Sequence, residues 1–144
     1  MPELTVRDCM HAGVIACAPD ASLEEVAETM RQRHVSALVV VDGGLAVGLI
    51  SKTDLVNASF VAPYMRYWRG LSARHLMSAP VVAVRPEAPL REALERLRRH
   101  RIHRVVVTEV ADGGERPIGI LSLTDVVQRL GAGPRDEAAK EAWR

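Results

Sequence analysis

Two short polar segments contain the residue types best suited to holding a small polar ligand. Ser51-Lys-Thr-Asp54 and Ser122-Leu-Thr-Asp125 each follow an apolar run and open a stretch with helical patterning. A carboxylate just inside a helix start can accept hydrogen bonds from both hydroxyls of a ribose, and the free N–H groups of a helix N-terminus suit a phosphate. The Ser-x-x-Asp spacing also fits a capping box, which satisfies the helix start itself. Because capping and ligand binding are compatible, the spacing alone leaves both interpretations open.

The two segments belong to an internal repeat that covers most of the 144-residue chain. A displacement of 67 positions aligns residues 10–41 with 77–108, and 12 of these 32 pairs are identical. A displacement of 71 positions aligns residues 48–54 with 119–125. The four additional residues fall around Asp112-Gly113-Gly114, a turn where an insertion costs little. Each copy is only about 60 residues, a marginal size for an independent domain, so we expect the two copies to pack face to face.

Each copy is predicted to fold in the order strand, helix, strand, strand, helix. Ser22 and Glu25 form a capping-box start for the first helix, and Pro89 replaces the serine in the second copy. The apolar helix faces are Leu23, Val26, Ala27 and Met30 in one copy and Leu90, Ala93, Leu94 and Leu97 in the other. The predicted strands are residues 14–17, 37–41, 46–50, 81–84, 105–108 and 117–121, and the second helices begin near Ser51 and Ser122.

The composition indicates an ordinary globular protein. Apolar residues make up 48%, charged residues 26% and the net charge is +1, which gives no sign of a nucleic-acid or anionic membrane partner. No apolar run approaches the roughly 18 residues that cross a bilayer, and the N-terminus does not resemble a signal peptide. Cys9 and Cys17 form no CxxC pair and are interpreted as small apolar residues. We therefore expect a cytoplasmic protein.

The repeat resembles the CBS domain, named for cystathionine β-synthase. Residues 34–41 with 48–54, and residues 102–107 with 119–125, carry the resemblance, and they are similar to stretches of the nucleotide-sensing subunit of AMP-activated kinase. The resemblance implies an α+β fold in which two tandem CBS repeats, each β-α-β-β-α, pack as a pseudo-two-fold pair. The expected boundaries are repeat one at 1–59, a connector at 60–70, repeat two at 71–131 and a polar tail at 132–144.

The resemblance also implies two nucleotide sites in the cleft between the copies. In the family, the base packs against one copy while the ribose and phosphate reach the Ser-x-Thr-Asp segment of the other. The primary site then combines Val14, Ile15, Val35, Ser36 and Ala37 with Ile120, Ser122, Thr124 and Asp125. The second site combines Val81, Val82, Ile102 and His103 with Leu49, Ser51, Thr53 and Asp54.

The two sites are not expected to be equivalent. His103 and Arg104 match the family's phosphate-contacting pair and are assigned to the primary site, beside Asp125. The matching positions beside Asp54 are Ser36 and Ala37, which carry no charge, although Lys52 is a partial substitute. The Asp125 site is therefore predicted to bind a phosphorylated ligand more tightly.

Other features allow less specific interpretations. The arginine-rich run 96–104 fits a solvated helix C-terminus in its first part, and nucleic-acid binding through it is the weaker alternative. Cys9, His11 and His75 are a weak candidate for a metal site, and the glycines at 43, 44 and 48 are typical of a hairpin. The connector aromatics Phe60, Tyr64, Tyr67 and Trp68, with Arg66 and Arg69 among them, fit a packed linker helix, a dimer surface or a lid.

The sequence supports a regulatory module rather than an enzyme, because no nucleophile with a partner base, no paired catalytic carboxylates and no Walker loop is present. The prediction is a stand-alone CBS pair that binds AMP, ADP or ATP as a regulatory ligand and senses energy state, with no catalytic cofactor and no metal. A homodimer and an unidentified effector protein are the expected partners, without a membrane. The alternative is a ligand-free structural or protein-interaction module.

Overall fold

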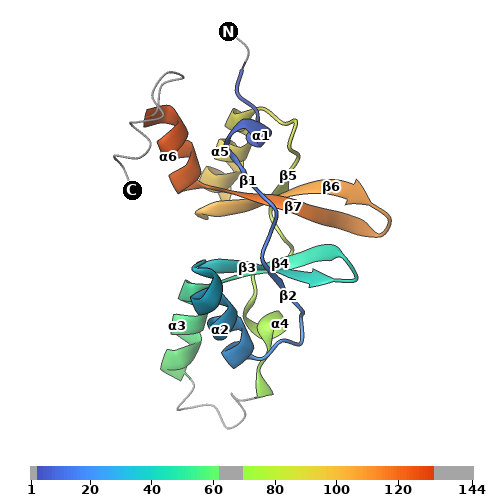
Figure 1. The fold of residues 1–144 in the computed structure, drawn as a ribbon, viewed down its shortest axis with the longest axis vertical. Coiled ribbons are helices and arrows are strands. Elements are labelled where there is room, and N and C mark those ends of the chain that lie inside the picture. Colours follow the sequence, from blue (N-terminus) through green and yellow to red (C-terminus); the bar gives the residue numbers. More distant parts are fainter. Residues whose placement is uncertain (1–2, 62–69, 132–144) are drawn as a thin grey trace. The chain divides into compact units, whose positions relative to one another are not determined.

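The computed structural model describes residues 3–61 and 70–131 (Figure 1). The predictions for Tyr64, Arg66, Tyr67, Trp68, Arg69 and the tail at 132–144 lie outside these ranges. The described chain forms a mixed α/β structure with one four-stranded and one three-stranded sheet. The two strand-helix-strand-strand-helix repeats expected from the sequence are confirmed.

The chain forms two compact units that do not coincide with the two sequence repeats. Among the described residues, unit 1 comprises 3–13, 82–109 and 118–131, and unit 2 comprises 14–61, 70–81 and 110–117. We call residues 3–13 and 71–81, which open the two repeats, their lead-ins. Each unit therefore takes its lead-in from the other repeat. In unit 1 the Val6 N–H donates to the Ala88 carbonyl at 2.9 Å, and in unit 2 the Ala73 N–H donates to the Ala21 carbonyl at 2.9 Å. These backbone bonds attach each lead-in to the loop before the other repeat's first helix.

Unit 1 contains the four-stranded sheet in the order β1-β7-β6-β5. Its strands are β1 (His11–Ala12), β5 (Ala83–Val84) and most of β6 (Arg104–Ala111) and β7 (Gly114–Ser122), and its helices are α1 (Val6–Cys9), α5 (Leu90–His100) and α6 (Leu123–Gly131). The tip of the β6–β7 hairpin, residues 110–117, is assigned to unit 2. β1 runs antiparallel to β7, with His11 opposite Ile120. This pairing fixes the N-terminal lead-in along the strand that leads directly into α6.

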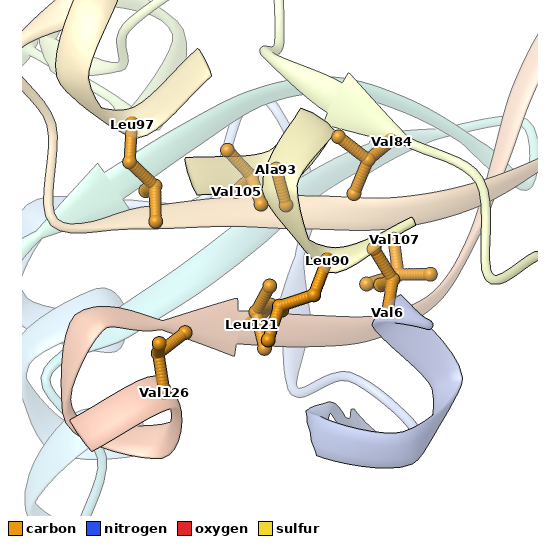
Figure 2. Packing of buried hydrophobic residues seen from close by; sticks show 9 residues of the cluster. All are labelled: Val6, Val84, Leu90, Ala93, Leu97, Val105, Val107, Leu121 and Val126. Atoms are coloured by element: carbon orange, nitrogen blue, oxygen red, sulfur yellow. The ribbon is translucent and has the colours of Figure 1, made fainter. Parts of the chain in front are cut away.

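The core of unit 1 is aliphatic, as the scarcity of aromatic residues requires (Figure 2). The three helices contribute Val6, Leu90, Ala93, Leu97 and Val126, and the strands contribute Val84, Val105, Val107 and Leu121. Burying one such large aliphatic side chain contributes about 1.5–3 kcal/mol. The predicted α5 face is confirmed, with Leu94 packed at its margin.

Unit 2 contains the three-stranded sheet in the order β2-β3-β4. Its strands are β2 (Ala16–Cys17), β3 (Ala37–Asp42) and β4 (Leu45–Ser51), and its helices are α2 (Leu23–Arg33), α3 (Lys52–Val61) and α4 (Ala73–Leu76). Its buried cluster is Val26, Met30, Leu38, Val40, Ile50 and Ala73. Ala73 belongs to the lead-in of the second repeat, so the core of unit 2 also depends on the exchanged segment.

Several sequence expectations are corrected in detail. The predicted strands at 14–17 and 81–84 shorten to two residues each, because each pairs in parallel with its neighbour over only two positions. Ala27 is exposed rather than buried, since only Val26 and Met30 of α2 are fully covered. Cys9 and Cys17 are free thiols and only half-buried. The short helices α1 and α4 were not predicted.

The turn and capping predictions are confirmed. Ser22 and Glu25 form the capping box of α2, and Pro89 is the N-cap of α5. Gly43 and Gly44 have positive φ in the β3–β4 turn, as a hairpin requires. The helices α2 and α5 both end at a left-handed residue, His34 with φ 54° and Arg101 with φ 53°.

Candidate functional site

The Asp125 segment lies where a strand of unit 1 passes directly into a helix. β7 ends at Ser122 and α6 begins at Leu123. The Ser122 N–H donates to Asp125 Oδ2 at 2.8 Å, and the Asp125 N–H donates to Ser122 Oγ at 3.1 Å. The capping box is therefore present, and it holds the carboxylate at the helix start in one orientation.

The Asp54 segment repeats this arrangement in unit 2. The Ser51 N–H donates to Asp54 Oδ2 at 2.8 Å, the Ser51 hydroxyl donates to the same oxygen at 3.0 Å, and the Asp54 N–H donates to Ser51 Oγ at 3.3 Å. All of these bonds to the carboxylate reach Oδ2. Within the part of the chain that the structure describes, Asp54 Oδ1 has no hydrogen-bond partner.

Asp125 differs because its second oxygen is also occupied. His11 Nε2 lies 2.9 Å from Asp125 Oδ1, and the side chains are 79% and 6% exposed respectively. Asp125 is thus a buried carboxylate, and its outward oxygen is covered by an exposed imidazole. From the sequence His11 was only a weak metal candidate, because its contact with Asp125 depends on how residues 3–13 pack against the other repeat.

The predicted phosphate-contacting pair lies beside the same helix start. The Leu123 N–H donates to the His103 carbonyl at 2.9 Å, and Arg104 opens β6 with its side chain half-buried. The matching bond in unit 2 runs from the Lys52 N–H to the Ser36 carbonyl, also at 2.9 Å. The backbone frame is the same in both units, and the side chains placed by it differ in charge.

The remaining predicted residues divide between the units. Unit 1 holds His103, Arg104, Ile120, Ser122, Thr124 and Asp125 of the primary set, with Val82 and Ile102 of the second set. Unit 2 holds Leu49, Ser51, Thr53, Asp54 and Val81 of the second set, with Val14, Ile15, Val35, Ser36 and Ala37 of the primary set. Each unit therefore holds the Ser-x-Thr-Asp segment of one predicted site at one helix start, and the ribose, phosphate and base assignments all stay predictions.

The lead-in helices carry a further electrostatic difference. The Thr5 N–H donates to Asp8 Oδ2 at 2.8 Å, and this bond, with one from the Thr5 hydroxyl, lowers the pKa of Asp8. At the matching position of the second repeat, His75 Nδ1 accepts the Ser72 N–H at 2.9 Å. Elsewhere, burial raises the pKa of the Cys17 thiol.

The weaker candidates gain no support from the described residues. Cys9 and His11 belong to unit 1 and His75 to unit 2, and no group of three metal-binding side chains occurs among residues 3–61 and 70–131. In the same ranges no helix is long and apolar enough to cross a membrane. Gly48 lies within β4, so the glycines at 43, 44 and 48 belong to a hairpin.

The CBS domain family matches residues 6–60 and 73–132. The chain therefore belongs to the CBS domain family and carries two of its repeats, as the sequence predicted.

The comparisons with individual proteins agree with this family. The γ-3 subunit of 5′-AMP-activated protein kinase from Homo sapiens is 33% identical over 107 residues, which are 71% of this chain and 21% of that subunit. The chain thus spans about a fifth of that relative's length. Among solved structures, the CBS domain pair of protein MJ0100 in complex with methylthioadenosine and S-adenosyl-L-methionine has a TM-score of 0.78 at 21% identity, covering 90% of this chain and 98% of that one. CBSX2 in complex with AMP has a TM-score of 0.71 at 26% identity, covering 97% and 98%.

Proposed function

We propose that this CBS pair is a regulatory module that binds an adenine nucleotide, AMP, ADP or ATP, at the start of α6. The observation that carries the proposal is Asp125, a carboxylate 6% exposed and fixed at a strand-to-helix junction with one oxygen directed toward an exposed side chain. A ribose diol can replace that side chain with two charge-assisted hydrogen bonds. The AMP complex of CBSX2 and the similarity to the kinase subunit support this ligand class.

The phosphate is assigned to the groups that surround the same helix start. Ser122 and Thr124 supply hydroxyls, and the first N–H groups of α6 carry the positive end of the helix dipole. His103, just before the adjoining strand β6, and Arg104, its first residue, add two basic side chains. This concentration of donors fits a phosphorylated nucleoside, and the proposed role is regulation by binding.

The Asp54 site is proposed as the weaker of the two. Ser51 and Thr53 supply matching hydroxyls at the start of α3. However, Ser36, just before the adjoining strand β3, and Ala37, its first residue, are both uncharged. Lys52, which is exposed, is the one cation of the segment 51–54. A phosphorylated ligand should therefore prefer Asp125.

Ligand binding and site assignment can be tested together by calorimetry and thermal unfolding. The ligands are AMP, ADP, ATP, NAD and S-adenosylmethionine, and the proteins are the parent, Asp125→Ala, Arg104→Ala and the matched control Asp54→Ala. A ligand at about 100 times its dissociation constant should stabilise the parent by roughly 2.7 kcal/mol, a shift of a few degrees. We expect Asp125→Ala to abolish the shift, Arg104→Ala to reduce it for phosphorylated ligands, and Asp54→Ala to retain most of it.

The opposite outcomes are equally informative. Urea unfolding without ligand verifies that each variant is folded, since loss of a cap costs about 1 kcal/mol. If folded Asp125→Ala and Arg104→Ala bind like the parent, the site assignment is wrong. If no ligand shifts the parent, the nucleotide function itself is wrong.

A protein-interaction role is the second candidate, and exposed apolar side chains favour it. On α6, Leu123, Val127 and Leu130 recur at helical spacing and are 40%, 62% and 70% exposed. On α3, Val56 and Phe60 are 54% and 71% exposed. Such stripes are typical of helices that pack against a partner, which for the proposed homodimer would be a second copy. Light scattering of the parent and of Val127→Glu with Val56→Glu would show whether these faces hold an oligomer together.

A further inference from the structure

The two carboxylates at the helix starts differ in what a ligand must displace. Asp125 accepts the Ser122 N–H on Oδ2 and faces His11 Nε2 at 2.9 Å on Oδ1. Asp54 accepts both Ser51 donors on Oδ2. The residue of the second repeat that matches His11 is Ser78, whose backbone N–H and carbonyl bond Leu49 at 2.9 and 3.1 Å. Within the described residues, therefore, only the carboxylate of Asp125 contacts a titratable side chain before a ligand binds.

The backbone holds His11 firmly while the ring itself stays accessible. His11 lies opposite Ile120 in the β1–β7 pair, and the Gly13 N–H donates to the Ile118 carbonyl at 2.7 Å. Gly119 permits this approach, since a Cβ at that position would lie 2.5 Å from the His11 carbonyl oxygen. The side chain is nevertheless 79% exposed. The ring can therefore exchange protons with solvent and rotate off Asp125 without any change in the strand pairing.

We propose that His11 is a proton-dependent gate on Asp125, which deepens the nucleotide-binding function proposed above and rests on it. Imidazole titrates close to physiological pH, unlike any other ordinary side chain. An imidazolium at Nε2 makes a charge-assisted bond to Oδ1, about twice as strong as the neutral one. Because a ribose diol needs the same oxygen, the protonated ring competes with it more strongly. Ligand affinity at Asp125 should therefore fall as the pH decreases through the imidazole range.

The other charged groups on the neighbouring elements do not replace this contact. On α1, Arg7 forms an ion pair with Glu87 at 3.2 Å. Asp8 accepts a hydrogen bond from Thr5 and is attracted electrostatically by Arg129 of α6. His103 and Arg104 lie at the start of β6. Asp125 is the ion-pair partner of His11 within the part of the chain that the structure describes. His103 is the other imidazole close to this helix start, so it must be controlled separately.

The test measures the affinity of adenosine and of AMP by calorimetry between pH 5.5 and 8.0. Adenosine carries the ribose without a phosphate, so it isolates competition for Asp125 from attraction of a phosphate to His11. The variants are His11→Ser, which installs the residue of the matching position, His11→Gln, which keeps a neutral donor, and His103→Gln as the control. Circular dichroism at each pH verifies folding.

For the parent we expect adenosine affinity to fall about tenfold between pH 7.5 and pH 5.5, as competition by a titrating group predicts. Binding at the acidic end of this range should release protons, which is measured by repeating the titration in buffers of different ionisation enthalpy. His11→Ser and His11→Gln should lose the pH slope and the proton release, and His103→Gln should keep both for adenosine. His11→Ser should bind adenosine at pH 5.5 at least as tightly as the parent does at pH 7.5.

The outcomes separate the gate from the function on which it rests. Binding that requires Asp125 but shows the same pH slope in the parent and His11→Ser would overturn the gate alone. An affinity that rises at low pH and loses this rise in His11→Ser would also overturn it, because His11 would then hold the ligand instead of competing with it. Absence of binding, or binding that Asp125→Ala leaves unchanged, would overturn the proposed function and the gate together.

Discussion

The starts of α3 and α6 share one backbone arrangement and differ in the side chains around it. In both, serine and aspartate form a capping box, and the first helical N–H donates to the carbonyl of the residue before the adjoining strand. Around Asp125 stand His11, His103 and Arg104. The matching residues around Asp54 are Ser78, Ser36 and Ala37.

This difference shows which features the repeat preserves. The hydrogen bonds of the caps, lead-ins and strands recur in both units, since each satisfies backbone groups that would otherwise be left unpaired. The side chains at the charged positions differ between the units, so they are not part of this shared frame. One frame thus carries two sites of unequal chemistry, and variants at matched positions can test how far the two units are equivalent.

The largest expected loss of stability concerns Gly119 of β7 and Gly48 of β4, where the backbone of a lead-in passes close to the strand. A Cβ at Gly119 would lie 2.5 Å from the His11 carbonyl oxygen, whereas at Gly48 it would lie 2.5 Å from Met77 Sδ and 2.9 Å from the Ser78 carbonyl oxygen. The end of a methionine side chain can move, but a paired backbone carbonyl cannot. Gly119→Ala should therefore cost about 3 kcal/mol and Gly48→Ala about 2 kcal/mol.

Urea unfolding gives these free energies, with Gly70→Ala as the control because no atom lies within 4 Å of its added Cβ. Equal losses for the two crossing glycines would mean that the Ser78 carbonyl is as confining as that of His11. No loss at either position would contradict the exchanged lead-ins.

A smaller and opposite effect is expected at the ends of α2 and α5. His34 and Arg101 occupy the left-handed region, which costs a residue with a Cβ about 1 kcal/mol. His34→Gly and Arg101→Gly should each stabilise the protein by up to about 1 kcal/mol, measured by the urea midpoint. Arg99→Gly, inside the exposed face of α5, is the control and should destabilise by a similar amount. Unequal gains would show that the two helix ends are not equivalent.

The smallest expected effect is a pH-dependent contribution of Asp8 to stability, which would distinguish α1 from α4, where His75 stands at the matching position. The bonds from Thr5 lower the pKa of Asp8, so its contribution to stability is complete above the ordinary carboxyl pKa and is lost as the pH falls through the lowered value. Asp8→Ala should therefore be less stable than the parent at pH 6, and the gap should narrow toward pH 3. Asp20→Ala, at an exposed turn, is the control for the removal of a surface carboxylate. A gap for Asp8→Ala that does not change with pH would remove this distinction between Asp8 and His75.

Local pattern in the sequence determined much of the architecture. The two copies, their five-element order and the caps at Ser22, Ser51, Pro89 and Ser122 followed from spacing, because helical periodicity and capping depend on residues three or four apart. The resemblance to the CBS domain then identified the family and the residues expected to bind a nucleotide. The short helices α1 and α4 could not be predicted, because four residues are too few to show a helical periodicity of apolar side chains.

Tertiary structure alone decided which segments meet. The exchange of lead-ins brings Val6 of the first repeat into the core of unit 1, which the second repeat mainly builds. It brings Ala73 of the second repeat into the core of unit 2, which the first repeat mainly builds. It also places His11 on Asp125, more than a hundred positions away along the chain. No sequence periodicity encodes such a pair, because periodicity reports only on residues a few positions apart. The pair forms because the apolar side chain of each lead-in is buried in the core of the other repeat.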